Sequence, residues 1–273
     1  MKVTVIFTCF NRKEKSLKCM KTLADQNSGI EHHFIVVDDN STDGTAEAIL
    51  ALGNNVELLH GSGSLYWAGG MRKGINAYLE SGSDSDYVLL VNDDVEFSKG
   101  IINQLIAESK EKMDAVIVGA TCDDSGAFTY GAMQLIVPRK KDIYRQVSPA
   151  EGNVECDTFN CNCVLLSDAV IRKAGNFDPI YTHSLADIDY GLRLRKRGFH
   201  IYSSEEYVGV CNKNSIKGTW ADSSLSRRER IKKKESPKGA PFKEWFYFMK
   251  KNFGVLSAIR YSISPYLRIL LKR

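Results

Sequence analysis

Short apolar runs alternate with amphipathic segments in the first third of the chain. Residues 3–8, 34–37 and 88–91 are apolar runs of strand length, and residues 14–24 and 46–52 have a helical pattern. Strands separated by helices predict an α/β fold with a doubly wound, mainly parallel sheet flanked by helices. The carboxyl ends of the strands in such a sheet meet at one crevice, where ligands bind.

Polar residues follow each of these three apolar runs. The first run leads into a polar elbow, the second into a pair of acids, and the third into an Asn-Asp-Asp sequence. Because the three strand ends converge, we expect one crevice to hold the side chains that follow them. These are Thr8, Phe10, Asn11, Arg12, Asp38, Asp39, Asn92, Asp93 and Asp94.

The adjacent acids Asp93 and Asp94 predict a bound cation. Two carboxylates beside a buried strand repel each other unless a positive charge lies near them. Hard oxygen ligands at a strand end suit Mg²⁺ or Mn²⁺, with the remaining ligands supplied by a substrate diphosphate. An ordinary turn with solvated Asn and Asp side chains is the alternative for this segment.

Two common phosphate-binding loops are absent from the sequence. No G-x-G-x-x-G follows the first strand, and no G-x-x-x-x-G-K-[ST] occurs anywhere in the chain. The sequence therefore disfavours a dinucleotide-binding fold and a P-loop NTPase. Phosphates would have to be bound by a metal ion and by Arg or Lys.

A further acidic segment lies later in the chain. Asp187 and Asp189 precede an Arg-rich amphipathic stretch at residues 191–197. The dipole at a helix N-terminus favours the ionised form of such acids. An ionised carboxylate near a bound diphosphate can take the proton of an acceptor hydroxyl as a general base. The alternative is that the carboxylate only caps the helix.

Three motifs, in this order, resemble those of the family 2 glycosyltransferases, which are inverting enzymes with the GT-A fold. They are V-D-D-N-S-T-D-G-T at residues 37–45, L-V-N-D-D-V at residues 90–95 and A-D-I-D-Y-G-L-R-L-R-K-R-G at residues 186–198. The resemblance covers about residues 1–215. It is to rhamnosyltransferase-like members that build bacterial surface polysaccharides.

The resemblance implies roles for individual residues. Asp39 would recognise the base of the sugar nucleotide. Asn92, Asp93 and Asp94 would handle the ribose and the metal, with Asp94 as the direct metal ligand. Asp187 would be the catalytic base.

The chain also departs from the family pattern. Asn92 stands where the family often has an acid, and Ala186 replaces a Glu, which removes a helper of the base rather than the base. Residues 210–214 read V-C-N-K-N, where the family often carries a His that completes the metal shell.

Residues 61–74 combine five glycines with Tyr, Trp, Arg and Lys. Small residues let the backbone approach a ligand closely, and aromatic and cationic groups suit a sugar diphosphate. The family has an element here that closes over the nucleotide, so we expect Gly70 and Arg72 to contact the donor. Trp67 is expected on the sugar or acceptor side. A Gly-rich turn with a buried Trp is the alternative.

Charge is divided unevenly along the chain. Residues 217–273 hold 15 Lys plus Arg against 4 Asp plus Glu, a net charge of +11, whereas the rest of the chain carries −7. We expect a GT-A catalytic domain over residues 1–215, with a nucleotide-binding half to about residue 110 followed by an acceptor half. Residues 216–273 would form a basic, aromatic-rich helical extension.

The apolar content of the extension favours an anionic membrane surface over nucleic acid as its partner. No uncharged run approaches the roughly twenty residues needed to span a bilayer. Pro265 is expected to interrupt the last helix. The alternative is that the aromatic residues pack on the catalytic domain or on a second subunit, as in a homodimer.

The seven cysteines show no C-x-x-C spacing and are expected to be buried hydrophobes. The sequence Met1-Lys2 leads directly into the first strand. We therefore expect a protein of the reducing cytoplasm, peripheral at most on the inner face of the cell membrane.

These observations predict a metal-assisted, inverting glycosyltransferase of bacterial type. The donor would be a nucleoside-diphosphate sugar, and the acceptor a hydroxyl of a glycan or lipid-linked glycan for a surface polysaccharide. A nucleotidyltransferase acting on a sugar phosphate is the first alternative, but it normally needs a Gly-rich loop with Lys or Arg after the first strand. A non-catalytic glycan- or nucleotide-binding scaffold is the second, and it would not require Asp39, Asp94 and Asp187 together.

Overall fold

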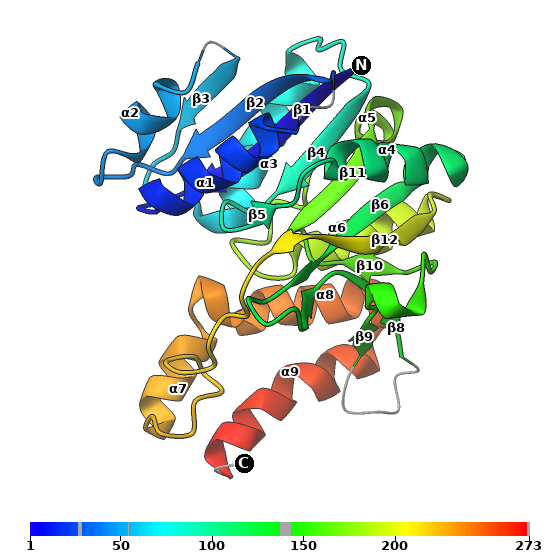
Figure 1. Cartoon of the computed structure of the whole chain (residues 1–273). Coiled ribbons are helices and arrows are strands. Elements are labelled where there is room, and N and C mark those ends of the chain that lie inside the picture. The colour runs from blue at the N-terminus through cyan, green and yellow to red at the C-terminus, as the bar shows by residue number, and fades with distance from the viewer. Residues whose placement is uncertain (27–28, 54, 137–142, 272–273) are drawn as a thin grey trace.

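The computed structural model describes residues 1–26, 29–53, 55–136 and 143–271. Within them a nine-stranded sheet has the order β3-β2-β1-β4-β11-β6-β12-β5, with β7 beside β6 (Figure 1). Its strands are β1 (Lys2–Cys9), β2 (Glu31–Asp38), β3 (Val56–His60), β4 (Tyr87–Val91), β5 (Glu96–Phe97), β6 (Val116–Cys122), β7 (Phe128–Tyr130), β11 (Cys163–Ser167) and β12 (Ile201–Val210). Strands β1 to β4, β6 and β12 run in one direction, and β5, β7 and β11 oppose them. The predicted α/β class with a mixed, mainly parallel sheet is confirmed.

Helices cover both faces of this sheet. The helices of the body are α1 (Lys13–Ala24), α2 (Thr45–Leu50), α3 (Tyr66–Glu80), α4 (Ile101–Glu111), α5 (Asp168–Ala174) and α6 (Ala186–Lys196). Alternate residues of β1 point to opposite faces, so Val5 packs in one core with Met20 of α1, and Ile6 packs in the other core with Ile75 of α3. Each such buried aliphatic side chain contributes about 1.5–3 kcal/mol to folding.

The strand register brings the predicted crevice together. Strand β1 is central, and it pairs in parallel with β2 on one side and with β4 on the other. Thr8 lies beside Val37, and Ile6 lies beside Leu90. The loops that follow these three strands therefore leave the sheet at the same edge, as the apolar pattern predicted.

A second, three-stranded sheet lies beside α6. It consists of β8 (Ala132–Leu135), β9 (Tyr144–Gln146) and β10 (Thr158–Phe159), and a short 3-10 helix at Pro149–Glu151 follows β9. The hydroxyl of Thr158 donates a hydrogen bond of 2.7 Å to the carbonyl of Ile188. A Cβ on Gly191 would lie 2.8 Å from Cα of Thr158, so the glycine permits this close approach of α6.

The C-terminal part forms helices that lie below the sheet in Figure 1. They are α7 (Arg227–Lys234), a 3-10 helix at Pro237–Gly239, α8 (Phe242–Phe253) and α9 (Val255–Leu270). Phe248 of α8 is fully buried in the core that contains α3 and α6. Packing on the body, one of the two alternatives for this segment, is therefore observed for α8.

Pro265 does not interrupt the last helix, so that expectation is wrong. Proline lacks the N–H that would bond to the carbonyl four residues earlier, which belongs to Tyr261. The structure supplies another donor, because Nε1 of Trp245 in α8 donates to this carbonyl at 3.1 Å. Among the described residues, no helix is long and apolar enough to cross a membrane.

Candidate active site

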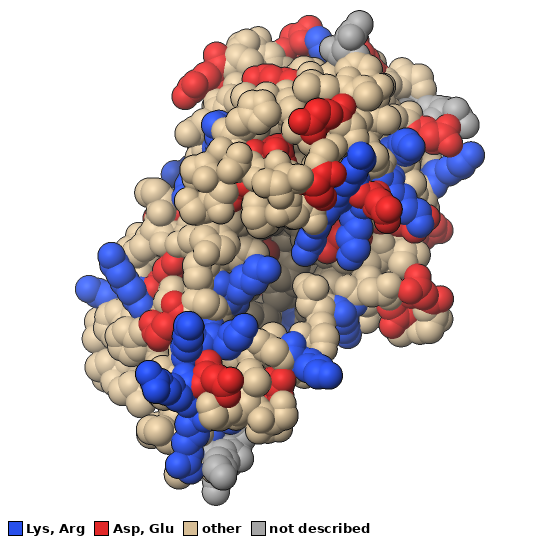
Figure 2. All heavy atoms as spheres, turned by 90° about the vertical axis from the view of Figure 1, so that its left-hand side faces the viewer, with Lys and Arg blue, Asp and Glu red and all other residues tan. Residues whose placement is uncertain are grey.

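A cavity of about 820 Å³ lies between the strand ends, α6 and the C-terminal helices. Its volume is typical of sites for small-molecule ligands. Figure 2 shows this side of the molecule hollowed between its upper and lower parts, with Lys and Arg side chains around the hollow. Six predicted site residues line the cavity: Arg12, Trp67, Asn92, Asp93, Asp94 and Asp187.

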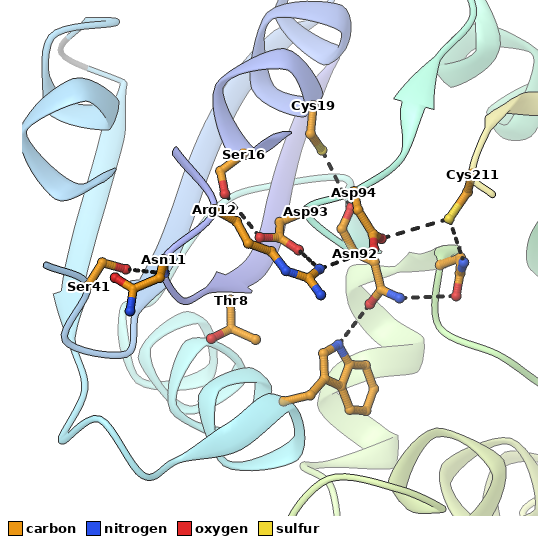
Figure 3. Close-up of polar contacts among 12 residues, drawn as sticks. Thr8, Asn11, Arg12, Ser16, Cys19, Ser41, Asn92, Asp93, Asp94 and Cys211 are labelled. Carbon is orange, nitrogen blue, oxygen red and sulfur yellow. Dashed lines mark hydrogen bonds and ion pairs between the residues drawn. The ribbon is translucent and has the colours of Figure 1, made fainter. Parts of the chain in front are cut away.

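Arg12 supplies the positive charge that the adjacent acids require. Its Nη1 lies 3.2 Å from Oδ1 of Asp93 and 3.1 Å from Oδ2 of Asp94 (Figure 3). Ser16 of α1 donates a hydrogen bond of 3.0 Å to the other oxygen of Asp93. The elbow after β1 and the end of β4 thus form one charged cluster.

The two acids differ in their surroundings. Burial raises the pKa of Asp93 to about 6, while Arg12 acts to lower it and Asp94 acts to raise it. The side chain of Asp94 is 18% exposed against 8% for Asp93. Asp94 is therefore the more accessible carboxylate at the cavity, whereas both oxygens of Asp93 accept hydrogen bonds from Arg12 and Ser16.

A chain of hydrogen bonds fixes Asn92 at the cavity wall. Nε1 of Trp67 donates to Oδ1 of Asn92 at 2.8 Å, and Nδ2 of Asn92 donates to Oδ1 of Asn162 at 3.1 Å. The chain continues from Asn162 to the sulfur of Cys211 and from that thiol to Asp94. An amide at position 92 can both accept from the indole and donate to Asn162, which a carboxylate cannot do.

The donor atoms at Asp94 fit a hard divalent cation with few protein ligands. The described residues contain no group of three or more His, Cys, Asp or Glu side chains arranged to hold a metal ion. Cys211 lies in the segment where the family often has a His, but burial raises the pKa of its thiol to about 12, so it donates to Asp94 as a neutral group. Mg²⁺ commonly binds one or two carboxylates and takes its other ligands from phosphates and water. Asp94 alone could supply the protein carboxylate of such a site.

Asp187 lies in the first turn of α6 and faces the cavity. Leu185, the residue that precedes α6, has a φ of 72°, a left-handed conformation that costs a non-glycine residue roughly 1–3 kcal/mol. Oδ1 of Asp187 accepts from the backbone N–H of Ile188 at 2.9 Å, and Oδ2 accepts from that of Cys161 at 3.2 Å. Burial raises the pKa of Asp187, and these N–H groups oppose the increase. Each oxygen keeps further acceptor capacity, so the group can receive a proton from a ligand in the cavity.

Asp189 has a different environment from Asp187. Its carboxylate is 1% exposed and accepts from Nζ of Lys251 at 2.7 Å and from Nδ2 of Asn252 at 3.0 Å. It is not among the residues that line the cavity. Both of its oxygens are bonded to α8, so it anchors that helix.

Asp39 also lies outside the cavity lining. Its two oxygens accept from the backbone N–H groups of Gly63, Leu65 and Tyr66 at 2.8, 2.9 and 3.1 Å. Tyr66 is the first residue of α3, which begins within the Gly-rich segment. In this structure Asp39 holds the segment that leads into α3 through these hydrogen bonds. Its contact with a nucleotide base stays a prediction.

Gly70 and Arg72 of α3 have packing contacts. A Cβ on Gly70 would lie 2.6 Å from Cβ of Thr8, so this glycine lets α3 approach β1 closely. The hydroxyl of Thr8 donates to the carbonyl of Val37 at 3.0 Å. Arg72 donates to the carbonyl of Tyr181 at 2.7 Å and lines a separate hollow of about 440 Å³. The expected donor contacts of Thr8, Gly70 and Arg72 stay predictions.

Asn11 joins the loop after β1 to the loop after β2. It has a φ of 50°, its backbone N–H donates to Oγ of Ser41 at 2.9 Å, and its Oδ1 accepts from the N–H of Thr42 at 2.8 Å. Phe10, its neighbour, is 49% exposed. Neither lines the cavity, and their predicted contacts with the donor stay untested.

Several residues that line the cavity were not predicted as site residues from the sequence. His183 is one, and its proximity to Asp187 in the sequence was the available signal. Burial lowers the pKa of His183 to about 4, and Lys238 and Arg12 act in the same direction. Further lining residues come from the C-terminal part and belonged to no motif, among them Trp220, Lys234, Lys238, Trp245 and Arg268.

A family model and a characterised relative both match this chain, and both are glycosyltransferases. Residues 4–172 match the family model of Glycosyl transferase family 2, which covers more than half of the chain. The N-acetylglucosaminyl-diphospho-decaprenol L-rhamnosyltransferase of Mycobacterium tuberculosis is 26% identical over 190 residues. The match covers 60% of this chain and 61% of that protein, so the chain spans about three fifths of the length of this relative.

Solved structures share the fold at low sequence identity. The mannosyltransferase PcManGT from Pyrobaculum calidifontis, in complex with GDP-Man and Mn²⁺, has a TM-score of 0.56 at 14% identity, covering 99% of this chain and 73% of that one. S. aureus TarS 1-349 in complex with UDP-GlcNAc has a TM-score of 0.59 at 15% identity, covering 100% and 72%. The predicted GT-A fold and family are confirmed, and the nucleotidyltransferase alternative is not supported. On the strength of the match over residues 4–172, this chain belongs to glycosyl transferase family 2.

Proposed function

We propose that this chain transfers a sugar from a nucleoside-diphosphate sugar to a hydroxyl of a glycan or lipid-linked glycan, with inversion at the anomeric carbon. The observation that carries this proposal is that Asp94 and Asp187 line the same cavity. One carboxylate is suited to the diphosphate side of a donor and the other to an acceptor hydroxyl. The family match and the sugar-nucleotide complexes among the structural neighbours support it.

The proposed reaction has one proton transfer and one displacement. The acceptor oxygen attacks the anomeric carbon as its proton passes to Asp187, and a new C–O bond forms. The bond between the anomeric carbon and the diphosphate oxygen breaks, and the nucleoside diphosphate leaves with that electron pair. Attack on the face opposite the leaving group inverts the configuration. The raised pKa of Asp187 makes it a stronger base than an exposed carboxylate.

We assign Asp94 as the residue that holds Mg²⁺ or Mn²⁺ in the donor complex. When bound, the ion would neutralise charge on the leaving diphosphate. Arg12 contacts both Asp93 and Asp94, so it keeps the two acids in position and adds a second positive charge at the same edge.

We further propose a lipid-linked acceptor for a surface polysaccharide and a peripheral position on the inner face of the cell membrane. Helix α9 carries a row of exposed apolar side chains at Leu256, Ile259, Ile263 and Leu267, with exposed fractions of 84, 47, 44 and 50%. The net charge of +11 over residues 217–273 would favour an anionic surface. The M. tuberculosis relative is named for a diphospho-lipid acceptor.

A panel of UDP-, dTDP- and GDP-sugars, tested by thermal shift with and without Mn²⁺, would examine the proposed function. A ligand at a hundredfold excess over its dissociation constant stabilises the folded state by about 2.7 kcal/mol. The expected result is one class of donor that stabilises the protein more in the presence of Mn²⁺ and is slowly hydrolysed. Binding without hydrolysis or transfer would instead favour a non-catalytic scaffold, and no binding by any sugar nucleotide would overturn the proposal.

A further inference from the structure

The cavity has walls of opposite charge. Asp93, Asp94 and Asp187 lie on the side formed by the strand ends and α6, where Arg12 pairs with the first two of them. The C-terminal part contributes a second wall, which we call the basic wall and define as Lys234 of α7, Lys238 of the following 3-10 helix and Arg268 of α9. The family model ends at residue 172, so the basic wall lies wholly outside the matched segment.

Lys234 is a buried cation in this wall. Its exposed fraction is 3%, its ammonium group donates to the carbonyl of Ala240, and it lies 5.9 Å and 5.8 Å from the ring centroids of Trp245 and Tyr266. Burial lowers its pKa to about 8. No carboxylate of the described residues is within ion-pair distance of it, although the charges of Glu235 and Glu244 act to raise its pKa. A bound anion would stabilise it.

Lys238 and Arg268 extend this positive charge to the opening of the cavity. Lys238 is exposed and Arg268 is partly buried. In the part of the chain that the structure describes, neither side chain forms an ion pair or a side-chain hydrogen bond. Lys238 also contributes to the lowered pKa of His183, which places its charge within electrostatic range of that cavity residue. Two cations at one cavity that have no ion pair with any described residue favour an anionic ligand there.

Helix α9 presents two different faces. Tyr261, Ser264, Pro265 and Arg268 line the cavity, whereas the apolar row that includes Leu267 is exposed on the outside. The same helix therefore combines a cationic contact with the cavity and an apolar surface next to it. A ligand with a phosphate group joined to an apolar chain matches both features.

We propose that the basic wall is the acceptor subsite and binds the diphosphate of a prenyl-diphosphate-linked glycan. This inference rests on the proposed function of the cavity. We assign the wall to the acceptor because it comes from the C-terminal helices, whereas the residues expected at the donor come from the strand ends and from α3. Trp220 and Trp245, which also line the cavity, offer flat surfaces for the sugar or the first prenyl units.

Geranyl diphosphate is a suitable probe, because it carries the diphosphate and a short prenyl chain without a sugar. Its binding to the full chain would be followed by the fluorescence of the cavity tryptophans. In Lys238→Gln/Arg268→Gln we expect its dissociation constant to rise by on the order of tenfold or more. The matched control is Lys232→Gln/Lys243→Gln, which removes two exposed positive charges from α7 and α8 outside the cavity lining and should change the constant by less than about twofold.

Three results would overturn the inference. One is equal weakening by the two double variants, which would indicate only a general effect of net charge. Another is binding of geraniol as tightly as geranyl diphosphate. The third is competition between UDP or GDP and geranyl diphosphate, with an equal loss of nucleotide affinity in Lys238→Gln/Arg268→Gln, because the wall would then bind the donor. If that variant unfolds at a lower temperature, Lys238→Gln alone is used, since this side chain is exposed.

The failure of this inference and that of the proposed function can be told apart. If sugar nucleotides bind and are hydrolysed but geranyl diphosphate does not bind, the acceptor subsite is wrong and the proposed function stands. If geranyl diphosphate binds through the basic wall but no sugar nucleotide binds, the proposed donor is wrong and the anion site stands.

Discussion

Asp189 and Lys251 form an ion pair in which Oδ2 and Nζ are 2.7 Å apart, and it joins the first turn of α6 to α8. This ion pair gives Asp189 a different environment from Asp187, although the two acids are close together in the sequence. Asp189 is bonded to the C-terminal helices, whereas Asp187 lines the cavity. Their substitutions should therefore have different consequences.

Asp187→Asn should leave the protein folded and abolish most of its turnover. The amide keeps the shape and an acceptor oxygen, but it cannot take the acceptor proton, and the loss of a general base lowers kcat by about a hundred- to ten-thousand-fold. Donor affinity should be unchanged. Single-turnover transfer and calorimetry of donor binding would measure the two effects.

Asp189→Asn is the matched control for that experiment. Losing a charged hydrogen bond to Lys251 should lower the free energy of unfolding by about 1.5–3 kcal/mol. Turnover by the molecules that remain folded should stay near the wild-type value. A stable Asp189→Asn protein without activity, beside an active Asp187→Asn protein, would show that the base has been assigned to the wrong residue.

Asp94→Ala should remove metal-dependent binding of the nucleoside diphosphate without unfolding the protein. The substitution deletes the more exposed of two adjacent carboxylates and leaves Arg12 paired with Asp93. Calorimetry with UDP or GDP, with and without Mn²⁺, gives the measurement. Glu47→Ala removes an exposed acid from α2 and should leave the affinity unchanged. Equal Mn²⁺ dependence in Asp94→Ala and the wild type would contradict the assignment.

His183 should make stability depend on pH below neutrality. Its Nδ1 accepts from the N–H of Trp67 at 3.4 Å, which requires the neutral ring, and its pKa falls from 6.5 to about 4. Between these values the unfolded chain binds more protons than the folded one, so stability is present above pH 6.5 and is lost as the pH falls toward 4. The loss can reach roughly 3 kcal/mol.

Urea unfolding at several pH values between 4 and 7 would test this dependence against His183→Gln. The variant lacks the titrating ring, so its free energy of unfolding should fall less over that interval. Parallel pH profiles for the two proteins would rule out a contribution from His183.

The outer face of α9 should mediate binding to anionic vesicles. Truncation before α8 is a poor test, because it removes the buried Phe248 and the partner of Asp189. Ile263→Glu/Leu267→Glu instead changes only two exposed apolar residues. We expect weaker co-sedimentation with acidic vesicles, most clearly at low salt, and an unchanged thermal unfolding temperature.

Met113→Glu/Leu50→Glu is the control for the α9 variant. It places the same two charges at exposed apolar positions on the body, which are 88% and 53% exposed. If both double variants lose vesicle binding equally, the effect comes from net charge and the surface of α9 is not the contact.

The sequence alone indicated the fold class, the family and the three acidic residues that line the cavity, Asp93, Asp94 and Asp187. Buried strands require continuous apolar runs, and loops at strand ends require polar residues, so β1, β2 and β4 could be located from local composition. The motifs around Asp94 and Asp187 were visible because each lies within a short contiguous segment.

Only the tertiary structure decided which side chains meet. Arg12 pairs with Asp93 and Asp94, Trp245 donates to the carbonyl of Tyr261, and Lys234 lines the same cavity as Asp187. These partners are far apart in the sequence, and their contacts depend on how α7, α8 and α9 fold back onto the body. Local periodicity describes the faces of a helix but does not specify which distant surface covers them, so the second wall of the cavity could not be read from the sequence.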